Sequence, residues 1–230
     1  MENHSVTRRG AMLRLLALWP ASFAVAPAWA ESVADGIGLV SPNVCLATPE
    51  TSEGPFYLDP GLVRADITEG RVGTPLRLKL QLVDEDCRPM GGVRVDVWHC
   101  DAGGSYSGVA GPGRGPAADT RAATFLRGTQ FAAADGVVTF ETISPGWYRG
   151  RIHSKVFLDE RTVLTSQVFF PDGASERVYR DPPYRDRAAG QDTTNATDGI
   201  ARRAGPRTFA RVAELPAGWE ATLVVGMARG

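Results

Sequence analysis

Residues 75–83 read Pro-Leu-Arg-Leu-Lys-Leu-Gln-Leu-Val, and this stretch decides the fold class. Leucine occupies every second position from Leu76 to Leu82, with arginine, lysine and glutamine between the leucines. Strict alternation of apolar and polar residues predicts a β-strand with one buried and one exposed face. The polar turn at residues 84–89 follows directly, and so the strand is expected to end near Val83.

A second alternating stretch, residues 92–100, places Val93, Val95, Val97 and His99 on one side. These two strands make either a hairpin or a crossover between two sheets. Other strand-like segments are separated by turn signals and cover residues 125–131, 136–142, 152–157, 161–170 and 220–227. Residues 109–121 and 174–207 are expected to be long surface loops. Short strands with few helical periods predict an all-β fold, an antiparallel β-sandwich with long loops.

The first 30 residues have the pattern of a secretory signal. The pair Arg8-Arg9 precedes an apolar run from Leu15 to Ala26, and Ala28-Trp-Ala30 closes the segment. A basic start, a short apolar middle and a small-x-small end are typical of export signals, and adjacent arginines indicate the twin-arginine route. The run is shorter than the roughly 20 residues that a membrane span needs. We therefore expect cleavage after Ala30, no membrane association afterwards, and one periplasmic or extracellular domain at residues 31–230.

Charge and cysteine content narrow the class of protein. Loss of residues 1–30 leaves 22 basic and 25 acidic residues, a balance that gives no electrostatic footprint for nucleic acid. Three cysteines remain, so an oxidising compartment permits one disulfide and one thiol. A bridge between Cys45 and Cys87 is favoured, because Cys87 lies in a polar turn whereas Cys100 ends an apolar strand.

Residues 144–157 contain an unusual combination of reactive side chains. A phenol, a guanidinium and an imidazole lie within six positions, at Tyr148, Arg151 and His153. The turn Pro145-Gly146 leads into a predicted strand, and side chains two apart on a strand share a face. Arg151 and His153 should therefore point the same way, with Tyr148 just upstream. Taken alone, these residues are more typical of a half-buried aromatic and a hydrogen-bonded histidine than of a functional site.

Residues 144–157 belong to a series of short motifs that follow one another in order between about Thr51 and Pro171. They are Glu53-Gly-Pro-Phe-Tyr57, Val95-Asp-Val-Trp-His-Cys-Asp101 with Ser105-Tyr-Ser107, Phe125-Leu-Arg-Gly128, Asp135-Gly with Phe140 and Thr142, Pro145-Gly-Trp-Tyr148, and Thr165-Ser-Gln167 with Phe169-Phe-Pro171. The series resembles the intradiol ring-cleaving dioxygenases, non-haem ferric enzymes that open catechols between their two hydroxyls.

The resemblance implies a set of site residues. In that family two tyrosines and two histidines hold the iron, and the histidines are written His-x-His on a strand. Tyr106 and Tyr148 match the tyrosine ligands, and His153 matches the later histidine. Arg151 and Gln167 resemble the polar pair beside the substrate. Tyrosinate oxygens and imidazole are ligands that suit iron(III), so the implied cofactor is Fe(3+).

The sequence departs from the family pattern before His153. It reads Gly150-Arg-Ile-His153, without the residues, including the first histidine, that the family has after its arginine. Either those residues are deleted or Arg151 takes the first histidine's place, and both alternatives remove one ligand. The other histidine beyond the signal, His99, is expected to be a packed residue with one hydrogen bond, the alternative being a second approach to the metal.

The function that the resemblance implies is a non-haem iron(III) dioxygenase. It would cleave a catechol-type diol with O2 between the hydroxyls to give a muconate-type diacid, with Tyr148, Arg151 and Gln167 as its catalytic residues. The expected partners are therefore a small aromatic diol and O2, and a homo-oligomer is compatible with the sequence. The alternative is a metal-free, inactive, exported β-sandwich that binds a ligand or another protein.

Overall fold

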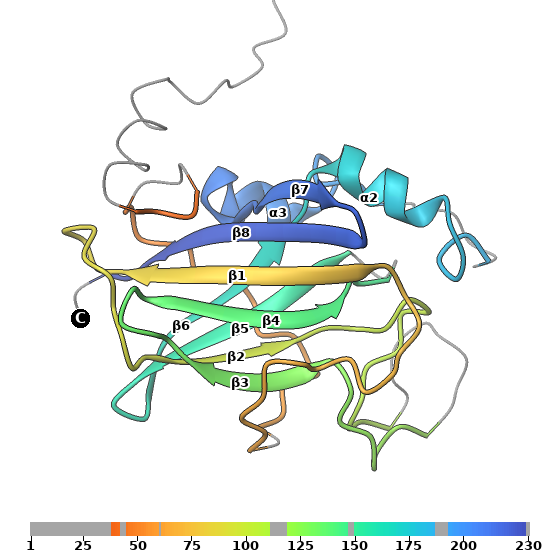
Figure 1. Ribbon diagram of the computed structural model, residues 1–230, viewed down its shortest axis with the longest axis horizontal. Helices are drawn as coiled ribbons and strands as arrows, with labels where there is room; N and C mark the ends of the chain where they lie inside the picture. The colour runs from red at the N-terminus through yellow and green to blue at the C-terminus, as the bar shows by residue number, and fades with distance from the viewer. Residues whose placement is uncertain are drawn as a thin grey trace, which may run out of the picture.

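The computed structural model describes residues 38–41, 45–59, 61–110, 119–146, 150–186 and 193–228. Within these residues the chain forms two four-stranded sheets, which lie one behind the other in Figure 1. The first sheet has the strand order β4-β1-β8-β7 and the second has the order β3-β2-β5-β6. The predicted all-β sandwich is therefore confirmed.

The elements have the following bounds. The strands are β1 (Pro75–Val83), β2 (Arg94–Trp98), β3 (Arg127–Phe131), β4 (Val137–Ile143), β5 (Arg151–Leu158), β6 (Arg161–Phe169), β7 (Arg211–Leu215) and β8 (Gly218–Gly226). The helices are α2 (Asp172–Tyr179), α3 (Gly199–Ala204) and the short 3-10 turn η1 (Pro206–Thr208). Every predicted strand is present, and β7 is a strand that the sequence did not suggest.

The core lies between the sheets and is built from the alternating residues. Leu76, Leu78, Leu80 and Leu82 of β1 are at most 2% exposed, and they share one cluster with Val93, Val95 and Val97 from the other sheet. Burial of each such side chain stabilises the fold by about 1.5–3 kcal/mol. Trp98, which alternates with these valines, therefore belongs to the opposite, outer face of the second sheet.

The connection between β1 and β2 is a crossover, because the two strands belong to different sheets. Strand pairing is antiparallel except for β1 with β8, which run parallel from Leu76 opposite Trp219 to Val83 opposite Gly226. The first and last strands thus lie side by side in the middle of one sheet (Figure 1).

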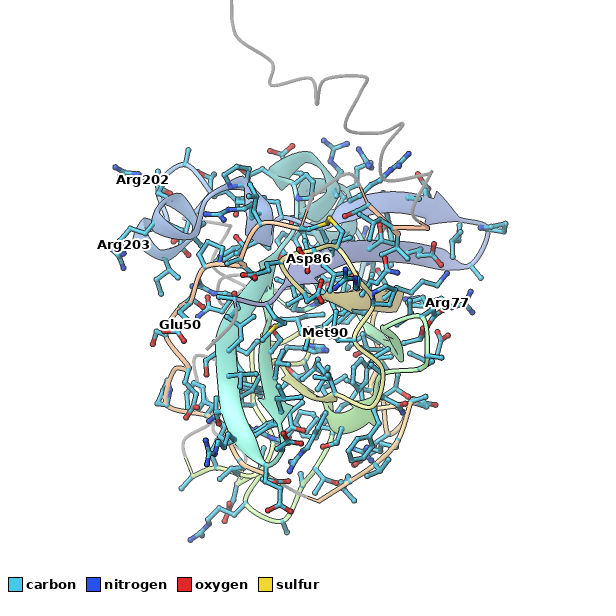
Figure 2. All side chains as sticks on the ribbon, turned by 90° about the vertical axis from the view of Figure 1, so that its left-hand side faces the viewer. Glu50, Arg77, Asp86, Met90, Arg202 and Arg203 are labelled. Atoms are coloured by element: carbon cyan, nitrogen blue, oxygen red, sulfur yellow. A yellow bond between two sulfur atoms is a disulfide. The ribbon has the colours of Figure 1, made fainter. Side chains whose placement is uncertain are left out.

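The prediction that residues 174–207 form a surface loop is wrong. Within the described parts of this segment, α2 and α3 each bury an apolar face, α2 through Ala174 and Val178 and α3 through Ala201 and Ala204. Residues on α3 pack against Phe169 at the end of β6. Arg202 and Arg203 lie on the exposed side of α3 and point outward in Figure 2. No helix among the described residues is long and apolar enough to cross a membrane.

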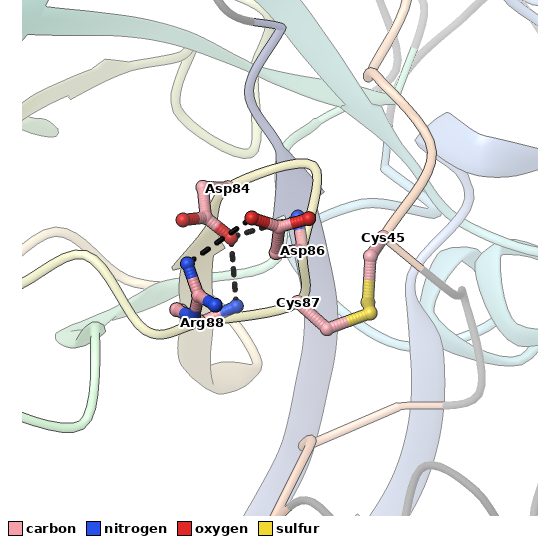
Figure 3. Close-up of a disulfide and its surroundings, with 5 residues drawn as sticks. All are labelled: Cys45, Asp84, Asp86, Cys87 and Arg88. Atoms are coloured by element: carbon pink, nitrogen blue, oxygen red, sulfur yellow. Dashed lines mark hydrogen bonds and ion pairs between the residues drawn. A yellow bond between two sulfur atoms is a disulfide. The ribbon is translucent and has the colours of Figure 1, made fainter.

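A disulfide fastens the N-terminal segment to the sandwich. Cys45 is bonded to Cys87, with 5.1 Å between their Cα atoms, and this pairing confirms the prediction (Figure 3). Cys87 lies in the turn after β1, where the Asp84 carboxylate accepts backbone N–H bonds from Asp86 and Arg88. Cys100 keeps its thiol, which is buried and donates to the carbonyl of Gly146. The predicted signal at residues 1–30 lies outside the described residues.

Candidate metal centre

A cavity of about 180 Å³ lies on the outer face of the second sheet. It is several times larger than the roughly 30 Å³ that one water molecule occupies. Its lining residues come from the 52–56 segment, the loop before residue 108, β5, β6 and α3, and they are Ser52, Gly54, Pro55, Phe56, Tyr106, Arg151, His153, Gln167 and Ile200. Four of the five predicted site residues are among them. The fifth, Tyr148, lies outside the described residues.

Strand alternation places two of these residues in the cavity. On β5, Ile152 and Val156 enter the core between the sheets, so Arg151 and His153 project to the outer face. The prediction that they point the same way is confirmed, because both are buried and both line the cavity. His153 lies opposite Gln167 on β6 and opposite Trp98 on β2.

The segment before β1 covers this outer face. Thr51 donates its backbone N–H to Thr165 on β6, and the Ser166 hydroxyl donates to the carbonyl of Pro49. The segment then turns at Gly54, where an added Cβ would lie 3.3 Å from Cε1 of His153. Because Gly54 also has a φ of +73°, glycine allows both the turn and this close approach to the imidazole.

His153 is a buried imidazole available as a metal ligand. Its ring stacks on Trp98 with 5.1 Å between centroids and meets Tyr106 edge-on at 6.3 Å. Its Nδ1 has no hydrogen-bond partner among the described residues. Burial, assisted by the positive charge of Arg151, lowers its pKa to about 3. The ring is therefore neutral near pH 7, the form that coordinates metals.

Tyr106 is held against the same cavity from the other side. Its ring stacks on Phe56 at 4.4 Å, and its carbonyl accepts a hydrogen bond from the Thr120 hydroxyl. The following residue, Ser107, accepts bonds from the buried guanidinium of Arg127 at its carbonyl and hydroxyl oxygens. Burial lowers the pKa of Arg127 to about 10, and the electrostatic interaction with Tyr106 partly opposes this shift. A cation thus lies near the phenol.

The guanidinium of Arg151 is bound on two sides. It donates to Oε1 of Gln167 at 2.7 Å and forms an ion pair with Oδ2 of Asp198, which lies 2.9 Å from Nη2. Gln167 in turn donates from Nε2 to the carbonyl of Ser52. On β5, Arg151 takes the position two residues before His153, where a His-x-His pattern has its first histidine. Its charged group is turned to Gln167 and Asp198.

Other acidic and histidine side chains have structural partners. His99 is fully buried and bonds the Cys100 carbonyl and the Thr142 hydroxyl at 2.8 Å each, so it is a packed residue with one hydrogen bond more than predicted. Asp96 accepts from the hydroxyls of Tyr57 and Thr129. Glu53 pairs with Lys155.

Sequence reasoning missed three residues that shape the site. Arg127 and Trp98 were quoted only as parts of motifs, and Asp198 was assigned to a loop. For Asp198 a signal exists, because an Asp followed by Gly-Ile-Ala-Arg-Arg is typical of a helix start with basic residues in its last turn. Its burial depends on contacts distant in sequence.

The ligand atoms that the structure describes in this cavity, from Tyr106 and His153, are of the types that bind ferric iron. A phenol and a neutral imidazole face one cavity, and Nδ1 of that imidazole has no hydrogen-bond partner in the part of the chain that the structure describes. Hard oxygen with imidazole is a donor set that suits iron. No cluster of three or more His, Cys, Asp or Glu side chains able to hold a metal occurs among the described residues. A site here would therefore depend on tyrosine oxygens, with Tyr148 as the second.

Comparison with known proteins agrees with this geometry. A family model described as Dioxygenase matches residues 48–156. A solved intradiol ring-cleavage dioxygenase from Tetranychus urticae is 29% identical, with a TM-score of 0.73, over 80% of this chain and 95% of that one. A second solved dioxygenase is 30% identical, with a TM-score of 0.72 and the same coverage of 80% and 95%. The chain belongs to the intradiol ring-cleavage dioxygenase family.

Curated sequence relatives add a narrower match. Catechol 1,2-dioxygenase 1 from Acinetobacter lwoffii is 30% identical over 106 residues, which are 44% of this chain and 32% of that protein. The chain thus spans about a third of the length of this curated relative.

Proposed function

We propose that this protein is an iron(III)-dependent intradiol dioxygenase that cleaves a catechol-type diol with O2 to a muconate-type diacid. One observation carries the proposal: Tyr106, His153 and the Arg151–Gln167 pair line a single cavity. The cavity walls include Phe56 and Ile200, which are apolar surfaces suited to a flat aromatic ring.

In this proposal Tyr106, Tyr148 and His153 hold the metal. A ferric ion bound there would withdraw electron density from a chelated diol and make its ring reactive toward O2. His153 is neutral and clamped between Trp98 and Gly54, so it is prepared to bind without first losing a proton. Tyr148, by analogy with the family, accepts a proton from one diol hydroxyl.

Arg151 and Gln167 act on charge and orientation. The guanidinium lies at the cavity wall, where its charge stabilises negative charge that develops on the substrate. Gln167 is expected from the resemblance to donate a hydrogen bond to substrate, but its Oε1 and one N–H already join Arg151 to Ser52. We therefore assign Gln167 first to holding Arg151, with one N–H remaining for substrate.

Export belongs to the same proposal. The signal-like residues 1–30 support a periplasmic or extracellular location, and the Cys45–Cys87 disulfide is typical of oxidising compartments. The competing proposal, an exported binding module without metal, is favoured by one feature. Arg151 stands at the strand position of the first histidine, so one protein ligand is absent.

Iron content and colour separate the two proposals. Protein purified after iron supplementation should contain iron, absorb broadly in the visible through tyrosinate coordination, and consume O2 with catechol, hydroxyquinol or protocatechuate. Tyr106→Phe should weaken the absorption, because it removes an anionic ligand. Tyr57→Phe is a matched control, since the Tyr57 hydroxyl bonds Asp96. Colourless wild-type protein without oxygen uptake would support the binding module instead.

A further inference from the structure

A buried ion pair forms one wall of the cavity. Arg151 and Asp198 are 4% and 5% exposed, and 2.9 Å separates their charged groups. The two residues are far apart in sequence, one at the start of β5 and the other at the start of α3. Charged pairs are rarely buried to this extent, because taking both ions out of water costs several kcal/mol per ion. The pair therefore calls for a physical explanation.

The Asp198 carboxylate is fixed by α3. Its Oδ1 accepts the backbone N–H groups of Ile200 at 2.7 Å and Ala201 at 3.4 Å, and so it caps the helix. Its Oδ2 is the atom that meets Arg151. Ala201 packs on Phe169, and the Arg151 guanidinium lies over that same ring at 5.3 Å. The helix start, the carboxylate and the guanidinium thus form one packed unit.

We propose that Asp198 is a positioning residue that neutralises Arg151 and holds its guanidinium at the α3 side of the cavity, leaving the side of Tyr106 and His153 to the metal ion. The inference rests on the proposed function, because it concerns the same metal centre. It explains how a cationic side chain can occupy the strand position before Ile152 and His153 without occupying the metal position.

Electrostatic repulsion between Arg151 and the metal ion is the reason that a counter-charge is needed. Arg151 is two residues from His153 on the same strand face, and an unpaired guanidinium there would repel a trivalent cation through a medium of low dielectric constant. Asp198 supplies one negative charge directly to that guanidinium and directs it toward α3. Gln167 supplies the second contact from β6. Removal of the carboxylate leaves the positive charge in place and takes away this ion pair, so the guanidinium is less compensated and less restrained.

The test compares the ferric affinity of Asp198→Asn, Arg151→Gln and the double variant. Asparagine is a good helix cap, so Asp198→Asn keeps the N-terminal cap of α3 and removes the charge. Affinity is measured by visible absorption during competition with a chelator, without reference to turnover. A unit charge this close should lower the affinity of Asp198→Asn by about ten-fold or more. The double variant should recover to within about three-fold of wild type, because it removes both charges.

A second readout uses the metal-free proteins. Asp198→Asn should lower the urea midpoint of unfolding, and the double variant should regain most of it, because a lone buried charge is the costly state. Glu220→Gln, which removes the partly exposed ion pair with Lys79 in the other sheet, is the matched control and should leave ferric affinity unchanged. If Asp198→Asn does not fold, the double variant alone tests the inference. A loss of ferric affinity in the double variant would overturn it.

The outcomes separate this inference from the proposed function. If wild-type protein and Asp198→Asn bind ferric iron equally well, only the role of Asp198 is overturned. Wild-type protein that binds no ferric iron would overturn both.

Discussion

At the scale of single residues, the site consists of side chains whose burial gives them their chemistry. His153 and His99 differ only in their surroundings. The ring nitrogens of His99 both have partners, whereas Nδ1 of His153 has none among the described residues. The same residue type is therefore structural directly after β2 and a ligand candidate on the neighbouring strand β5. Sequence offered the motif match for His153 but no contact information for either ring.

Burial of His99 should make stability depend on pH. Its folded pKa is lowered to about 4, chiefly by burial and secondarily by Arg127, while the unfolded value is about 6.5. Between these values the unfolded chain binds a proton that the folded chain does not, so stability falls as pH falls. From pH 7 to pH 5 the loss is about 2 kcal/mol.

Urea unfolding of metal-free protein at pH 7 and pH 5 measures this loss. His153, whose pKa is also lowered, adds a similar loss in wild type. The variant His99→Gln should retain only the His153 part, so its pH dependence should be about 2 kcal/mol smaller. An identical pH dependence in variant and wild type would show that His99 is not buried as a neutral ring.

At the scale of elements, the strands could be predicted and the helices could not. Strand β1 alternates because one sheet face meets the core and the other meets solvent. Strand β7 lies at the edge of its sheet and is mostly exposed, so it has no such pattern. Helix α3 has only six residues, too few for a helical period to stand out. The site depends on α3 through Asp198 and Ile200, which is why sequence reasoning found β5 and β6 but missed this wall.

Gly146 packs against the loop at residues 101–106, which carries Tyr106, and its backbone N–H donates to the Asp101 carbonyl. An added Cβ there would clash with the carbonyl oxygens of Asp101 and Ala102, backbone atoms that cannot rotate away. Gly146→Ala should destabilise the protein by about 1–3 kcal/mol. It should also lower ferric affinity, because the clash would displace the loop that leads to Tyr106.

A matched glycine provides the control for that experiment. Gly173 lies in α2, and its added Cβ would have nothing within 4 Å. Gly173→Ala should leave ferric affinity unchanged and should stabilise the protein by up to about 1 kcal/mol, as alanine does in helices. Equal effects of the two substitutions on the unfolding midpoint and on ferric affinity would contradict the proposed role of the contact between Gly146 and the loop that leads to Tyr106.

At the scale of the whole molecule, the disulfide connects the N-terminal segment to the first sheet. The bridge spans 42 positions of sequence, and closing such a loop restricts the unfolded chain by about 4 kcal/mol in the chain-entropy model. Cys45→Ser with Cys87→Ser should therefore lower the thermal midpoint, and reducing agent should lower it in wild type alone. A wild-type midpoint that does not respond to reductant would contradict this role.

The parallel pairing of β1 with β8 has a consequence for the nascent chain. Strand β8 lies between β1 and β7, so the middle of the first sheet is supplied by residues 218–226. While the ribosome is still making those residues, β1 has emerged with one row of backbone groups unpaired, although its leucine row can already pack against the valines of β2. Such an edge invites pairing with other chains. That row of backbone groups therefore stays open to other chains until residues 218–226 have left the ribosome.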